Sequence, residues 1–140
     1  MALSWCFADE SSPATDQVLA RAAAERFLVP ALWFSELANV LMMSERRGRL
    51  SSRQVTDQLR NFASLPFQVE PAGSQIVFGA VLDMARRERL TIYDATYLEL
   101  AQRHRVALAS LDQDLCAAAA RNAVPVIGPY RGNEASSSTR

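Results

Sequence analysis

The chain has 140 residues, no net formal charge and 49% hydrophobic residues. This length and composition predict one folded domain with a sizeable core, and the neutral charge argues against binding to nucleic acid by bulk attraction alone. Cys6 and Cys116 are the two cysteines, and no signal peptide is recognisable, so we expect a cytoplasmic protein without a disulfide framework. The most apolar run, residues 31–43, is interrupted by polar residues and is too short to cross a bilayer.

Helices and strands are predicted to alternate along the chain. The predicted helices cover about residues 13–26, 31–47, 51–62, 74–89, 91–104 and 115–121, and the predicted strands cover residues 27–29, 67–70, 106–109 and 124–127. Alternation with short connections predicts a three-layer α/β/α fold with a parallel sheet between helices. We expect residues 1–130 to form this domain and residues 131–140, which are polar and rich in serine, to form a disordered tail.

Residues 90–115 are predicted to bring two acids to one edge of the protein. Thr91 and Asp94 precede an apolar-periodic run, which is typical of a helix N-terminus. From Asp94 the helix advances about 15 Å, and the following strand returns the chain by about 16 Å. Asp94 and Asp112 are therefore expected at the same edge, where two acids can hold a divalent metal ion.

A third acid, Glu36, occupies a matching place early in the helix that follows the strand at Phe27. In parallel sheets, functional sites form at the carboxyl ends of strands, where all three acids fall. Carboxylates suit Mg²⁺ or Mn²⁺, which can activate a water and stabilise charge at a phosphate. The pattern therefore predicts a metal site made by Glu36, Asp94 and Asp112.

Each acid also has a purely structural interpretation. Asp94 could cap its helix together with Thr91, and Asp112 could be the N-cap of the next helix. Glu36 lies in a helix that we expect to be mostly buried, so it needs a partner, and a buried arginine is the alternative to a metal ion. Asn39, one turn further on, could hold Glu36 in place or only satisfy its own hydrogen bonds.

Other common site chemistries are excluded or weakly indicated. His104 is the only histidine, so a histidine pair or a catalytic triad is excluded, and no glycine-rich phosphate loop is present. Four aromatic residues are expected in the core or an interface more than on a base-stacking surface: Trp5, Trp33, Tyr93 and Tyr97.

All 15 basic residues are arginine. They cluster at predicted helix ends in residues 46–49, 86–89 and 103–105, where they either complement the helix dipole or bind phosphate. The sequence leaves both interpretations open.

Three stretches, in this order, resemble the PIN-domain proteins, specifically the VapC-type toxin ribonucleases. They are PALWFSELANVL at residues 30–41, LTIYDATYL at residues 90–98 and LASLDQDL at residues 108–115. The YDA-x-YL piece is the most specific of them, and the resemblance covers about residues 1–130. It implies a Mg²⁺-dependent (or Mn²⁺-dependent) endoribonuclease toxin of a toxin-antitoxin system, with RNA as substrate, a small antitoxin protein that neutralises it, and a homodimer.

The resemblance also assigns roles to residues of this chain. The implied catalytic and metal-site acids are Glu36, Asp94 and Asp112, with Asn39, Ser110 and Asp114 in supporting positions.

One departure from the family pattern concerns the N-terminus. The family opens with a strand that ends in an aspartate, in a run resembling V-D-A-S-V-A-L-x-W, and this sequence joins that run only at residues 1–5. We therefore expect the first acid and most of the first strand to be missing from the sequence given, which a start codon placed too far downstream would explain. Asp9 and Glu10 are poor substitutes because they follow that strand.

The alternative function is a non-catalytic PIN-like module that binds an antitoxin or a dimer partner.

Overall fold

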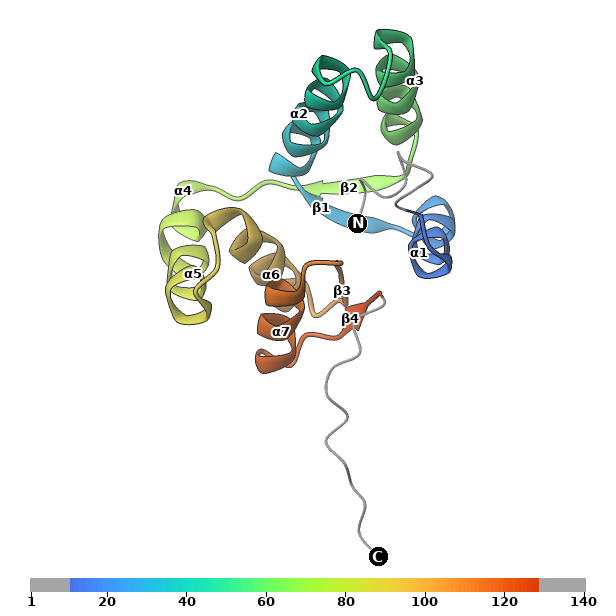
Figure 1. The fold of residues 1–140 in the computed structure, drawn as a ribbon. Coiled ribbons are helices and arrows are strands. Elements are labelled where there is room, and N and C mark those ends of the chain that lie inside the picture. Colours follow the sequence, from blue (N-terminus) through green and yellow to red (C-terminus); the bar gives the residue numbers. More distant parts are fainter. Residues whose placement is uncertain (1–10, 129–140) are drawn as a thin grey trace, which may run out of the picture.

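The computed structural model describes residues 11–128, which form a three-layer α/β/α fold (Figure 1). The helices are α1 (Pro13–Ala24), α2 (Leu32–Arg46), α3 (Ser52–Ala63), α4 (Ser74–Ile76), the π-helix η3 (Val77–Val81), α5 (Leu82–Glu88), α6 (Ile92–His104) and α7 (Gln113–Arg121). The strands are β1 (Phe27–Pro30), β2 (Phe67–Glu70), β3 (Leu108–Ala109) and β4 (Val126–Ile127). In Figure 1, α2 and α3 lie on one side of the β1–β2 pair, and α6 and α7 lie on the other. The predicted fold class is confirmed.

The strands pair in parallel, as predicted, but within residues 11–128 they form two separate pairs. β1 pairs with β2 from Phe27↔Phe67 to Pro30↔Glu70, and β3 pairs with β4 at two positions. A cavity of about 370 Å³ lies between them, lined by residues of both β1 and β3. Neither β1 nor β3 has a second strand partner in the described part of the chain. The stretches 1–10 and 129–140, which include the expected remnant of a first strand and the expected tail, lie outside the described residues.

Side-chain caps begin several helices where the sequence predicted them. Ser12 of α1 and Ser51 of α3 each form a reciprocal capping box with the residue three positions later. Thr91 caps α6 and Asp112 caps α7, each by accepting a backbone N–H from the first turn. Because these caps satisfy backbone groups locally, the helix starts could be found from the sequence alone.

The burial of α2 was predicted wrongly. Only three of its residues are buried, namely Leu37, Leu41 and Ser44. Phe34 and Met42 are 38% and 39% exposed. An apolar run that continues around a helix does not reveal which face is covered, and in the described residues the covered face of α2 is the one toward α3.

A π-helix interrupts the predicted fourth helix. η3 lies between α4 and α5, and its wider turn changes the direction in which the following side chains point. Ala80 is exposed, whereas Ala85 is buried. No helix among residues 11–128 has the length and apolar character needed to cross a membrane.

Two hydrophobic clusters hold the two halves of the described chain. The larger joins α5, α6, α7 and β3 around Leu98, which is fully buried, and the smaller joins α2 and α3 around Leu41 and Phe62. Trp33 packs edge-on against Phe62 and Phe67, which ties the smaller cluster to β2. The three acids named from the sequence lie at the seam between the two clusters.

Glu88 anchors the end of α5 to α7. Its carboxylate accepts hydrogen bonds of 2.8 Å from both Asn122 and Arg121, and its side chain is only 8% exposed. The hydrogen bond from Asn122 and then that from Arg121 hold the pKa of Glu88 below its ordinary value of 4.5.

We predict that Glu88→Gln lowers the free energy of unfolding at pH 7 by about 1 kcal/mol, because a charge-assisted hydrogen bond is lost. A lowered folded-state pKa gives stability that is fully present above pH 4.5 and is lost as the pH falls through the folded-state value. The difference between wild type and variant, measured by urea denaturation, should therefore shrink in acid. Glu25→Gln is the control: its ion pair with Arg21 is exposed, so the change should stay under about 0.5 kcal/mol. An equal effect of both variants, or a difference that does not depend on pH, would contradict this.

Candidate functional site

A cavity of about 270 Å³ lies at the carboxyl end of β3, between α2 and the start of α6. Glu36 reaches it from α2, Asp94 from the first turn of α6, and Asp112 from the N-cap of α7. The structure thus brings the three acids named from the sequence to one cavity, although up to 76 positions separate them in the chain.

Glu36 is held by a tyrosine. The Tyr97 hydroxyl of α6 donates a hydrogen bond of 2.5 Å to Oε1 of Glu36. The prediction that Glu36 is buried was wrong, because this residue is exposed, and no arginine pairs with it in the described part of the chain. Burial, followed by the hydrogen bond to Glu36 and the charges of Glu36 and Asp94, raises the pKa of Tyr97 well above its ordinary value. Tyr97 therefore stays protonated and keeps donating to Glu36.

Asp94 and Asp112 are held by the caps of their own helices. The Thr91 hydroxyl donates a 2.7 Å hydrogen bond to Oδ2 of Asp94, whose backbone N–H donates back to Thr91. Oδ1 of Asp112 accepts the backbone N–H of Leu115 at 2.8 Å. The structural interpretations of both acids are thus correct, but a capping role does not remove either acid from the cavity.

Each of the three carboxylates uses one oxygen in these contacts. Among residues 11–128, no hydrogen bond holds the second oxygen of Glu36, Asp94 or Asp112. Oxygen donors of this kind suit a hard cation such as Mg²⁺. However, within the described residues no three acidic, histidine or cysteine side chains lie close enough together to form a metal-binding group. One ion could therefore contact one or two of the carboxylates directly and would need water for its remaining ligands.

The three supporting residues differ in position. Ser110 is buried and lines the cavity, and its hydroxyl accepts the backbone N–H of Asp112 at 3.1 Å. The Cys116 thiol, whose pKa burial raises, donates to the Ser110 carbonyl at 3.6 Å and steadies the end of β3. Asn39 and Asp114 are exposed and do not line the cavity. No hydrogen bond joins Asn39 to Glu36 in the described residues.

Sequence reasoning missed the role of Tyr97, which was expected only to fill the core or an interface. A signal was present, because Tyr97 lies three residues after Asp94 and so shares its face of α6. Trp33, by contrast, makes edge-on contacts with three phenylalanines, as expected for a core residue.

Comparison with protein families identifies the family and the fold of the chain. A sequence model of the PIN domain matches residues 2–121. The chain belongs to the PIN-domain family. PIN domains are generally metal-dependent nucleases, and PIN nucleases bind RNA. No curated protein matches this PIN domain.

We predict that Tyr97 makes this PIN domain less stable in alkali. The raised pKa means that the unfolded chain ionises above pH 10.0 while folded Tyr97 keeps its proton. The free energy of unfolding should therefore fall with pH by at most about 1.4 kcal/mol per unit for this group. Urea denaturation on either side of pH 10.0 should show a shallower fall for Tyr97→Phe than for wild type. The same slope in both proteins would show that the pKa of Tyr97 is not raised in the folded protein.

Proposed function

We propose that this PIN domain is a Mg²⁺-dependent endoribonuclease, in which Mn²⁺ can replace Mg²⁺, and that it acts as a VapC-type toxin neutralised by a small antitoxin. The observation that carries the proposal is that Glu36, Asp94 and Asp112, from three separate elements, line one cavity at the carboxyl ends of parallel strands. The resemblance of the YDA-x-YL stretch to the VapC-type toxins supports the narrower part of the proposal.

The roles of the residues follow from how each is held. Asp94 and Asp112 sit on rigid helix starts, and Tyr97 fixes the position of Glu36, so the three carboxylates are oriented before any ligand binds. Without a cation, neighbouring carboxylates repel one another, which gives the cavity a preference for positive charge. A bound Mg²⁺ supplies activation of a water and stabilisation of charge at the phosphate. Its protein ligands would be the unheld oxygens of one or two of these acids, with water in the remaining positions.

We further propose that the acid set is completed by an aspartate on a strand that precedes residue 1. The cavity between β1 and β3 supports this, because two parallel strands without a second partner in residues 11–128 border the same space. A strand there would join the two pairs into one sheet and would end near Glu36 and Asp112. An N-terminally extended chain should unfold at higher urea concentration and bind Mn²⁺ more tightly than the chain of residues 1–140. If neither property changes, no strand fills this space.

The alternative is a non-catalytic module that binds an antitoxin or a second copy of the chain. The observation that favours it is the lack of a three-residue metal group in the described part of the chain. The two functions differ in a simple assay, because only the nuclease shortens RNA when Mg²⁺ is added and stops when the metal is chelated.

We predict that Asp94→Asn abolishes Mg²⁺-dependent RNA cleavage while leaving the fold intact. Asparagine retains an oxygen that accepts from Thr91, so the start of α6 is preserved, but the negative charge is lost. Cleavage is followed with a labelled single-stranded RNA, and folding with circular dichroism. Asp57→Asn is the matched control, since Asp57 pairs with Arg60 on the exposed face of α3. Unchanged cleavage in Asp94→Asn would remove Asp94 from the site, and no cleavage by any extended or unextended form at high concentration would favour the non-catalytic module.

A further inference from the structure

Tyr93 is an exposed aromatic residue beside the acidic cavity. It is the second residue of α6 and directly precedes Asp94. Of the two places expected for it, the core is excluded because Tyr93 is 62% exposed, and within residues 11–128 its ring contacts no other aromatic ring. Single exposed rings are common on protein surfaces, but this one directly precedes Asp94, which lines the acidic cavity, so it is placed to contact what the cavity binds.

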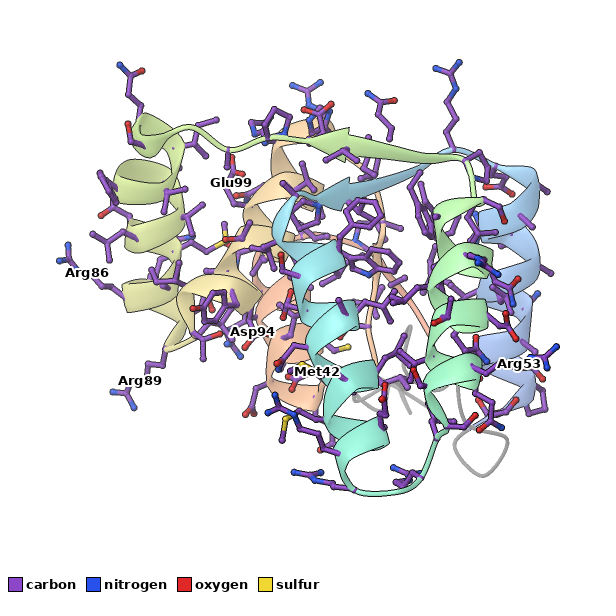
Figure 2. The ribbon with its side chains drawn as sticks, turned by 90° about the horizontal axis from the view of Figure 1, so that it is seen from above. Met42, Arg53, Arg86, Arg89, Asp94 and Glu99 are labelled. Atoms are coloured by element: carbon purple, nitrogen blue, oxygen red, sulfur yellow. The ribbon has the colours of Figure 1, made fainter. Side chains whose placement is uncertain are left out.

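Arg89 lies on the other side of the helix cap from Tyr93, four residues earlier in the chain. Its backbone ends α5 in the left-handed conformation, with φ 56° and ψ 39°. Residues other than glycine, asparagine and aspartate rarely adopt this conformation. Arg89 is exposed and forms no ion pair in the described part of the chain, whereas its neighbour Arg87 pairs with Glu88. Figure 2 shows Arg89 projecting outward from the end of α5, on the flank of the molecule next to Asp94.

We propose that Arg89 and Tyr93 form a subsite for one nucleotide of single-stranded RNA, adjacent to the acidic cavity. Tyr93 stacks on the base, and Arg89 binds the phosphate. This inference rests on the proposed function, because it takes the acidic cavity as the place where RNA is cut. The chain from Arg89 to Tyr93 spans at most about 15 Å, which keeps both residues within reach of neighbouring parts of one strand.

The chemistry of the two side chains selects a single strand. A duplex hides the faces of its bases, whereas an unpaired base exposes a face on which an aromatic ring can stack. A guanidinium beside the ring adds a phosphate contact that does not depend on sequence. The chain has no net charge, so it does not attract RNA as a whole. The guanidinium of Arg89 would supply this attraction locally, beside acids that would otherwise repel a phosphate.

The test measures RNA binding without cleavage. Fluorescence anisotropy follows a fluorescein-labelled single strand of about twelve nucleotides and mixed sequence in EDTA at several salt concentrations. The variants are Tyr93→Ala, Tyr93→Phe and Arg89→Gly. Arg105→Gly is the matched control, since Arg105 also ends a helix in the left-handed conformation, with φ 55° and ψ 43°, but at the far end of α6. Both glycine variants remove one charge and suit the backbone at their positions, so neither should lower the melting temperature.

We expect Tyr93→Ala to weaken binding about fivefold or more, and Tyr93→Phe to stay within about twofold of wild type. Arg89→Gly should weaken binding and reduce the slope of log K against log salt by about 0.7, as loss of one phosphate contact does for a single strand. Arg105→Gly should leave both the affinity and the slope unchanged.

Several outcomes would overturn the subsite. Wild-type affinity in Tyr93→Ala and Arg89→Gly, an equal loss in Arg105→Gly, equal binding of a duplex, or no binding of the single strand by wild type would each do so. If Tyr93→Ala changes only the self-association of the protein in sedimentation, Tyr93 belongs to a contact between copies and the subsite is likewise rejected. The Mg²⁺ cleavage assay decides the nuclease separately: a protein that binds through Tyr93 and Arg89 but never cuts keeps the subsite and loses the proposed function.

Discussion

The hydrogen bond between Tyr97 and Glu36 is the interaction on which the candidate site depends. It joins α6, which belongs to the larger hydrophobic cluster, to α2, which belongs to the smaller one. The two clusters share no buried residue, so side chains that reach across the seam set the distance between Glu36 and the two aspartates. Burial of Tyr97 raises its pKa and keeps the hydroxyl a donor, which makes this link insensitive to ordinary changes of pH.

The same seam explains why acidic side chains can be concentrated there. Asp94 and Asp112 are tied to helix N-termini, where the backbone N–H groups and the helix dipole stabilise negative charge. Their structural role and their proposed metal-binding role therefore support each other, since the cap fixes one oxygen and leaves the other unheld in the described residues. Membership of the PIN-domain family, whose members are generally metal-dependent nucleases, fits a cavity of this composition.

Local signals in the sequence predicted the local structure well. Three helices begin at side-chain caps, which are Ser12, Ser51 and Thr91. The chain runs out along α6 and returns along β3, and this return brings Asp112 to the same cavity as Asp94, as expected from the rise per residue of a helix and a strand. What failed depended on contacts between distant segments. The exposure of Glu36 could not be predicted because the apolar run in α2 does not show which face is covered. The partner of Glu36 lies 61 positions away, so only the structure could identify it.

The central claim is that Glu36, Asp94 and Asp112 together attract one divalent ion. Its most direct test is an NMR titration of the ¹⁵N-labelled protein with Mn²⁺, whose unpaired electrons broaden the signals of nearby amides. The account predicts that the earliest broadening is confined to the amides around Glu36, Asp94 and Ser110 to Asp112, and that excess Mg²⁺ reverses it. Signals of these residues that stay sharp, while amides beside other acids such as Glu70 and Glu99 broaden first, would contradict it.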